Sequence, residues 1–177
     1  MNRKLLFSYF IISVLLSCCN VAFKYDKELI RGLPTNPKWK LKGKLKKSEL
    51  RKFDTNCVYV LQEEINYEAG KYKQKYVFFR FWEDGHVMFR NYVLFNFPTI
   101  NDVNINYGTM AGYFTISNDI VTIELFGSWV WRWRYTYAKY KINTGDIICI
   151  SGDCTTDELN KPYKKYCLGP LTSKPDW

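Results

Sequence analysis

His86 is the only histidine of the 177-residue chain, so histidine-based catalysis would have to use this residue. A histidine general base needs a positioned partner, and the sequence around His86 identifies none. The adjacent carboxylates Glu63 and Glu64 would point to opposite faces of a strand, so they cannot work as an acid–base pair. The chain also lacks a Gly-x-Ser-x-Gly elbow, a phosphate-binding loop and a dinucleotide-binding fingerprint. We therefore expect no catalytic residue and no enzymatic activity.

The six cysteines could bind metal or form disulfides, and their spacing favours the second use. No pair has the two-residue spacing of a metal or redox motif, and a single histidine cannot complete a mixed cysteine–histidine site. We expect neither a metal nor a cofactor. Cys154 and Cys167 are predicted to close a loop by a disulfide, and buried free thiols are the alternative.

Aromatic residues alternate with arginines between residues 129 and 137. On a regular strand the rings would line one face and the arginines the other. The rings would then either fill the protein core or form an exposed platform for a sugar, a lipid or a protein. The candidate binding residues are Trp129, Trp131, Trp133, Tyr135, Arg132 and Arg134.

The N-terminus has the charge and hydropathy pattern of a secretory signal. Arg3 and Lys4 precede an apolar run over residues 5–16 that is too short to span a bilayer stably. The sequence Leu15-Leu16-Ser17-Cys18 resembles the bacterial lipobox, whose cysteine is acylated and becomes the first residue of the mature chain. This resemblance implies a signal peptide over residues 1–17, lipidation of Cys18 and a membrane anchor in the bacterial envelope, most simply the outer membrane. An ordinary signal peptide or an uncleaved anchor are the alternatives.

Residues 18–177 have the length of one domain with a substantial core. Residues 18–37 are predicted to be a tether, because Gly32, Pro34 and Pro37 interrupt any regular element. Residues 38–177 would form the domain. The formal net charge of +9 favours anionic surroundings such as lipid head groups or acidic glycans. Export makes nucleic acid the weakest partner, and the oligomeric state is left open.

Lysines at every second position of 38–46 would share one side of an extended segment. One interpretation is an edge strand that lysine protects from aggregation. The other is a polybasic patch that holds the domain against anionic head groups.

The strongest element prediction is a hairpin over residues 76–94. With Asp84-Gly85 as a two-residue turn, Arg80 would face Phe89 and Phe79 would face Arg90, which allows a cation–π contact on each face. Both faces are apolar, so a larger sheet must cover this ribbon.

A second hairpin is predicted over residues 109–126, around Asn118-Asp119. One face would carry the core, including Phe114 and Ile123, and the other face, including Tyr113 and Glu124, would be solvated. Gly112 would mark a bend or bulge.

Further strands are predicted at 57–64, 131–142, 147–150 and 163–167, with helical turns at 48–52 and 155–159 and loops at 66–74 and 101–106. Seven or eight strands joined mostly by hairpins predict an all-β, antiparallel up-and-down meander that closes into a barrel.

Three stretches of this meander carry a family resemblance: Phe-Arg-Phe-Trp-Glu-Asp-Gly-His-Val, Gly-Tyr-Phe-Thr-Ile-Ser-Asn-Asp-Ile, and Tyr-Lys-Ile-Asn-Thr-Gly-Asp-Ile-Ile. Over roughly residues 55–150 the chain resembles the small lipocalin-like lipoproteins of bacterial envelopes. The resemblance implies a lipocalin-like barrel that binds an apolar small molecule, a glycan or a protein without catalysis. The alternatives are a structural or accessory lipoprotein without a small ligand, and an envelope hydrolase. An enclosed apolar cavity would favour the first class, a filled barrel the second, and a cleft joining His86 to a carboxylate the third.

Overall fold

The computed structural model describes residues 23–26, 31–68, 71–94, 96–104, 110–129, 132–154, 158–175 and 177. The candidate lipidation site, Cys18, lies outside these residues, as does the predicted signal peptide. No helix in the described part of the chain is long and apolar enough to cross a membrane.

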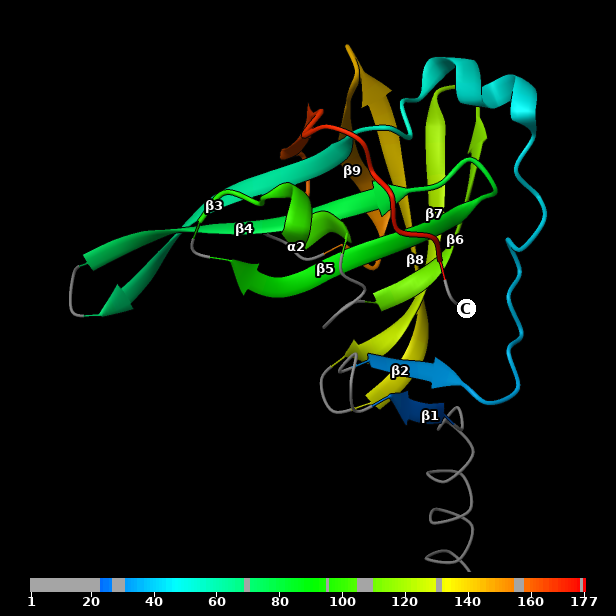
Figure 1. The fold of residues 1–177 in the computed structure, drawn as a ribbon, viewed down its shortest axis with the longest axis horizontal. Coiled ribbons are helices and arrows are strands. Elements are labelled where there is room, and N and C mark those ends of the chain that lie inside the picture. Colours follow the sequence, from blue (N-terminus) through cyan, green and yellow to red (C-terminus); the bar gives the residue numbers. More distant parts are fainter. Residues whose placement is uncertain are drawn as a thin grey trace, which may run out of the picture.

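β-Strands dominate the secondary structure (Figure 1). In chain order the elements are β1 (Phe23–Asp26), β2 (Arg31–Pro34), the 3₁₀ helix η1 (Lys47–Lys52), β3 (Val58–Glu68), β4 (Lys71–Phe81), β5 (His86–Leu94), α2 (Ile100–Asn104), β6 (Met110–Ser117), β7 (Ile120–Trp129), β8 (Arg132–Asn143), β9 (Asp146–Gly152) and β10 (Pro162–Tyr166).

The strands from β3 to β10 form a closed antiparallel barrel in the order β10-β3-β4-β5-β6-β7-β8-β9. Each strand from β3 to β9 pairs with its neighbours in sequence, and β10 closes the barrel between β9 and β3. This is the predicted all-β, lipocalin-like up-and-down barrel. The predicted strands at 57–64, 131–142, 147–150 and 163–167 correspond to β3, β8, β9 and β10.

The barrel interior is packed with aromatic rings because every second residue of each strand points inward. Phe53, just after η1, inserts a ring between Tyr59 and Phe81, with centroids 4.7 Å from each. Deeper in the barrel, Phe79 contacts Phe89, and also Tyr140 and Tyr163, with centroids 4.5–5.3 Å apart. The interior is therefore filled along the length of these two ring clusters.

The second hairpin has the predicted turn, since Asn118 and Asp119 both have positive φ and Ser117 pairs with Ile120. Its predicted core face is also correct. The prediction of a solvated opposite face is wrong, because Tyr113 and Glu124 are fully buried. Gly112 does not mark a bulge; a Cβ there would collide with the backbone oxygen of Glu124.

The first hairpin differs from its predicted register by one residue. Its loop has three residues, Glu83-Asp84-Gly85, and Gly85 adopts φ +93 at the third position. Arg80 therefore pairs with Met88, and Phe78 pairs with Arg90. The predicted placement of the arginines on two faces is wrong, because the register puts both on the outer face.

Three segments predicted as irregular or extended are different in the structure. The tether contains the β1–β2 hairpin. The described residues of the predicted 66–74 loop continue β3 as far as Glu68 and β4 from Lys71, and this ribbon projects beyond the barrel body in Figure 1. The asparagine-rich 101–106 loop begins as α2, where Thr99 Oγ1 and N–H both donate to the Asp102 carboxylate. The predicted turn at 155–159 falls partly outside the described residues.

Candidate functional site

The predicted aromatic stripe is not on one strand. β7 ends at Trp129, β8 begins at Arg132, and these two residues pair with each other, so the chain reverses between them. Trp131 lies outside the described residues, as do the side chains of Trp129 and Arg132. The rings at 133, 135 and 137 do share one face of β8, and this face is the outside of the barrel.

Trp133 and Tyr135 are half-buried beneath the chain's own N-terminal arm, which we define as residues 23–26 and 31–46. The Trp133 ring stacks on Phe23, with centroids 4.4 Å apart, and on Phe126 at 5.8 Å. Gly32 passes so close that a Cβ would collide with the Trp133 ring. Figure 1 shows the β1–β2 hairpin lying against the end of the barrel formed by β7 and β8.

Trp39 provides the second contact between the arm and the barrel. Its ring meets Tyr113, Tyr135 and Phe126 edge-on, at centroid distances of 5.2, 5.0 and 6.5 Å. The adjacent backbone N–H of Lys38 donates to the Tyr135 hydroxyl at 2.8 Å. The surface that the sequence offers as a partner platform thus binds the protein's own arm.

Glu124 anchors the arm by its buried carboxylate. The backbone N–H groups of Lys40 and Leu41 each donate to it at 2.8 Å, and the Tyr137 hydroxyl donates to the same carboxylate. Burial raises the pKa of Tyr137, and the hydrogen bond to Glu124 raises it further. The phenol therefore stays protonated and remains a donor at neutral pH.

Arg134 lies on the opposite side of β8 from the rings, as predicted. It is exposed and its guanidinium contacts Asp153 at 3.1 Å. An ion pair of this kind at the surface contributes little to stability. Nothing in the described structure joins Arg134 to Trp133 and Tyr135 in one binding site.

His86 does have a carboxylate beside it, in an open hollow of about 510 Å³ that also contains Trp82 and Lys174. Its Nδ1 lies 2.8 Å from Asp84 Oδ1. Its Nε2 lies 3.1 Å from the backbone oxygen of Trp177. Acceptor oxygens therefore lie beside both ring nitrogens, but only Nε2 makes a hydrogen bond, and it is directed at the C-terminal backbone.

The outer face of β3, β4 and β5 is covered by α2 and by the C-terminal segment, residues 168–175 and 177 (Figure 1). Arg80 is buried here and donates to the backbone oxygens of Val103 and Ser173 at 2.9 and 2.8 Å. Burial lowers the pKa of the Arg80 guanidinium to about 10. Arg80 still carries its charge at neutral pH and joins α2 to the C-terminal segment.

The cavity inside the barrel is small. It measures about 30 Å³ and is lined by residues that include Phe89, Met110 and Tyr140. A volume of this size accommodates about one water molecule. Ligand pockets in proteins measure roughly 300–1,000 Å³, so the interior has no room for an apolar small molecule.

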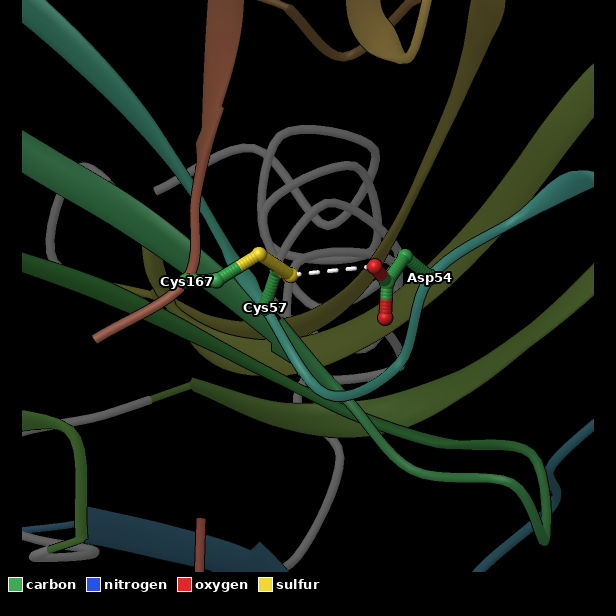
Figure 2. A group of neighbouring side chains, drawn as sticks. All are labelled: Asp54, Cys57 and Cys167. Carbon is green, nitrogen blue, oxygen red and sulfur yellow. Dashed lines mark hydrogen bonds between the residues drawn. A yellow bond between two sulfur atoms is a disulfide. The ribbon is translucent and has the colours of Figure 1, made fainter. Parts of the chain in front are cut away.

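The disulfide prediction is wrong in its pairing. Cys167 is joined to Cys57, and Cys154 is joined to Cys149. Cys57 and Cys167 directly extend the β3–β10 ladder, in which Val58 pairs with Tyr166. Their Cα atoms are 4.3 Å apart, and the bond ties the two strands together where β10 closes the barrel (Figure 2). A sequence does not reveal connectivity, because strand pairing alone brings Cys57 to Cys167.

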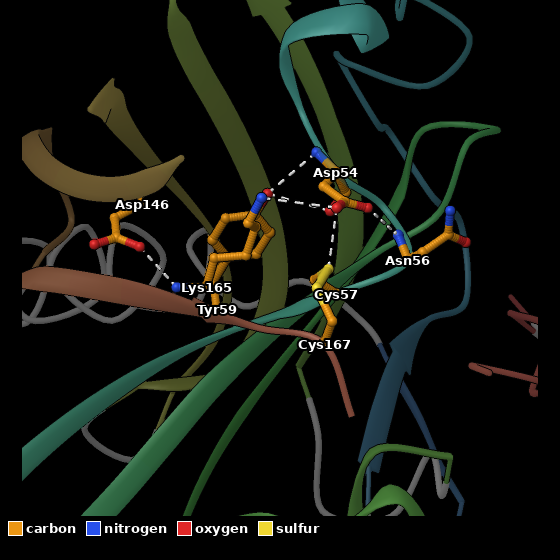
Figure 3. The surroundings of a disulfide bond; sticks show 7 residues. All are labelled: Asp54, Asn56, Cys57, Tyr59, Asp146, Lys165 and Cys167. Atoms are coloured by element: carbon orange, nitrogen blue, oxygen red, sulfur yellow. Dashed lines mark hydrogen bonds and ion pairs between the residues drawn. A yellow bond between two sulfur atoms is a disulfide. The ribbon is translucent and has the colours of Figure 1, made fainter. Parts of the chain in front are cut away.

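Asp54 lies at the same end of the barrel and faces this disulfide. Its Oδ2 is 3.1 Å from Cys57 Sγ, and its Oδ1 accepts the Asn56 backbone N–H at 3.0 Å (Figures 2 and 3). The Tyr59 hydroxyl donates to the Asp54 backbone oxygen at 3.2 Å, and burial raises the pKa of Tyr59. Lys165 Nζ is 3.8 Å from the Asp54 carboxylate.

The ligand atoms of Asp54, Cys57 and Cys167 all lie within 4.8 Å of one another. Metal binding by cysteine requires thiolates, and two sulfurs joined to each other carry no negative charge. In this oxidised form the Cys57–Cys167 bond closes the barrel covalently, and an Asx turn positions the Asp54 carboxylate beside it.

Three residues that organise the surface were not identified from the sequence. Glu124 follows an alternating strand pattern typical of an exposed position, and Arg80 likewise lies within a predicted strand. Neither carries a local signal, because the segments that bury them are distant in sequence. Asp102, which caps the N-terminus of α2 together with Thr99, did carry a local signal, because Thr99 and Asp102 have the spacing of a capping box.

Comparison of the chain with protein-family models, with curated proteins and with solved structures found no match.

Proposed function

We propose that this chain is a lipid-anchored protein of the bacterial envelope that acts as a non-catalytic accessory or interaction module, with partners meeting its outer surface. The Leu15-to-Cys18 motif supports the anchor. The shape of the barrel and the contacts of His86 support the rest.

The filled barrel interior is the observation that carries this proposal. The cavity between the inward-facing side chains of the described strands measures about 30 Å³. Apolar ligand binding in a lipocalin-like barrel would require the aromatic rings of Phe79, Phe89 and Tyr140 to leave their packed positions. Opening a space by removing one such ring costs about 3–5 kcal/mol in other cores. The barrel therefore suits a scaffold better than a carrier.

The contacts of His86 argue against a hydrolase. A general base must offer a free ring nitrogen to the proton that it removes. Here the ring nitrogen that makes a hydrogen bond, Nε2, is directed at the backbone oxygen of Trp177 at 3.1 Å. The Nε2 contact instead joins the start of β5 to the C-terminal segment.

The projecting β3–β4 ribbon is one surface open to a partner. β10 pairs with β3 only at residues 58–60, and β5 pairs with β4 only from Tyr76 onward. Within the described residues the outer parts of β3 and β4 pair only with each other. Main-chain groups along such ribbon edges can accept an added strand from another protein.

Ligand binding is tested with full-length protein purified from membranes in detergent, titrated with fatty acids and with a small aromatic probe. We expect no stoichiometric binding to the wild type. Phe89→Ala provides the positive control, since it enlarges the interior cavity and should admit the aromatic probe. Stoichiometric, competable fatty-acid binding to the wild type would overturn the proposal.

Anchoring is tested by mass spectrometry of the mature N-terminus after expression in a Gram-negative host. We expect a diacylated Cys18, and Cys18→Ala should leave the precursor unprocessed or release the protein from the membrane fraction. Cys19→Ala is the matched control and should be processed like the wild type. An unmodified N-terminus in the wild type would remove the anchor from the proposal.

A further inference from the structure

Six exposed lysines lie along the segment that runs from β2 to the first residue of η1. We call them the lysine belt: Lys38, Lys40, Lys42, Lys44, Lys46 and Lys47. The residues between them, Trp39, Leu41 and Leu45, are half-buried against the barrel. In Figure 1 the segment runs along the outside of the barrel from β2 to η1.

The belt is not an edge strand, so protection of a sheet edge does not explain its lysines. The barrel is closed, and residues 38–46 form no ladder with it. Gly43 adopts φ +69, which breaks the extended conformation. The alternation nevertheless persists, because Trp39 and Leu41 are held against β6, β7 and β8 by ring packing and by Glu124.

Protein contacts do not neutralise the belt. None of the ion pairs in the described part of the chain involves its six lysines. Two ammonium groups lie over aromatic faces, Lys40 over Tyr137 at 5.2 Å and Lys42 over Tyr113 at 5.5 Å. Glu49 is the only acid in residues 38–52, which also contain Arg51 and Lys52. The belt is therefore a row of exposed positive charge, with the buried Glu124 carboxylate beneath it at Lys40 and Leu41.

We propose that the lysine belt is a docking surface for an anionic lipid bilayer and holds one side of the barrel against the head groups. Each lysine near an anionic surface contributes about 1 kcal/mol, and the attraction decays within a Debye length. Two features favour a bilayer over other polyanions. The charges form an extended row along an exposed segment, and the belt follows the candidate acylation site in sequence. The lysines supply the attraction themselves, so docking does not require acylation.

The test measures partitioning of the full chain onto vesicles, with Cys18→Ala and Cys19→Ala introduced so that no acyl chain contributes. One vesicle set contains phosphatidylcholine alone, and the other also contains phosphatidylglycerol. The ratio of the two partition coefficients isolates the electrostatic part, because the apolar N-terminus contributes to both. The belt variant is Lys38→Gln/Lys44→Gln/Lys46→Gln. Its matched control removes three exposed lysines elsewhere on the barrel, Lys139→Gln/Lys141→Gln/Lys164→Gln.

We expect the belt variant to lower this ratio about 100-fold, from about 1 kcal/mol per lysine. The control should lower it less than about tenfold, and Lys38→Arg/Lys44→Arg/Lys46→Arg should keep the wild-type ratio, since it keeps the charge. Raising the salt concentration should abolish the preference for anionic vesicles. Thermal unfolding of all variants should match the wild type and so report intact folding.

Equal losses in the belt and control variants would overturn the proposal, as would a wild type without preference for anionic vesicles. Tighter binding of a soluble polyanion than of vesicles with the same charge would assign the belt to a different partner. Failure of acylation would appear only in the mass spectrum of the N-terminus. It would leave this vesicle assay unaffected, so the two proposals fail separately.

Discussion

Removing the Cys57–Cys167 disulfide should destabilise the barrel much more than removing Cys149–Cys154. A disulfide lowers the conformational entropy of the unfolded chain, and its effect grows with the length of the closed loop. The first bond joins residues 110 positions apart and the second joins residues 5 positions apart. Loop-closure entropy gives about 4.7 kcal/mol for the long loop and about 2 kcal/mol for the short one.

The two bonds make a matched pair for this measurement. Cys57 and Cys149 are equally buried, so alanine substitution there removes a similar sulfur from a similar environment, while their partners differ: Cys167 is exposed and Cys154 is half-buried. The difference of about 2.7 kcal/mol expected between the double variants therefore reports mainly on loop length. The long-range bond also holds β10, which has only five residues and closes the barrel.

We would measure denaturant unfolding of Cys57→Ala/Cys167→Ala and Cys149→Ala/Cys154→Ala by tryptophan fluorescence. The first should lose about 4–5 kcal/mol, a large part of the roughly 5–15 kcal/mol typical of a domain. Its melting temperature should fall by roughly 10–15 °C. A reductant should lower the wild type to the stability of a variant lacking both bonds. Equal losses in the two double variants would refute the assignment of Cys57–Cys167 as the bond that closes the barrel.

Four further predictions concern the segments that cover the barrel and the loop between β4 and β5. Glu124→Ala should lower the free energy of unfolding by roughly 2–4 kcal/mol, since it leaves the Lys40 and Leu41 N–H groups without their acceptor. It should also speed tryptic cleavage within residues 38–47, and an unchanged cleavage rate would contradict the anchoring role of Glu124. Arg80→Met should lower the free energy of unfolding by roughly 2–4 kcal/mol, because it leaves the Val103 and Ser173 backbone oxygens unpaired. Chemical denaturation measures this loss, and Arg134→Met, at an exposed position, is the nearly neutral control. Burial raises the pKa of Asp102, but the hydrogen bonds from Thr99 and the charge of Arg90 outweigh burial, so the net pKa is lowered. The ionised Asp102 carboxylate therefore stabilises the folded protein fully above about pH 4, and this contribution is lost as the pH falls through the folded pKa. Asp102→Asn should remove that acid-dependent part of stability in a pH series of melting curves, and an unchanged series would argue against the cap. Gly85→Val should cost about 1 kcal/mol or more because φ is +93 there, and an unchanged melting temperature would contradict the three-residue loop.

Sequence alone was sufficient wherever the determinants were local. Asn118-Asp119 tolerates positive φ, and the strict alternation around it specifies which side of β6 and β7 enters the core. Repeated hairpin signals and the absence of long apolar helical patterns were enough to predict an antiparallel barrel. Local signals were less reliable for Asp84-Gly85, where both two- and three-residue loops accept the same residues, and the register shifted by one.

Only the tertiary structure decided what lies on the outside of the barrel. The strand pattern predicts solvated or ambiguous positions for three residues that are in fact buried: Tyr113, Glu124 and Arg80. They are covered by segments distant in sequence, the N-terminal arm in the first two cases and the C-terminal segment in the third. The disulfide pairing depends on the pairing of β10 with β3, which closes the barrel. Because the closed barrel has no edge strand, the lysine belt cannot protect one. Alternation along a strand specifies two faces, but it contains no information about a third layer that packs on one of them.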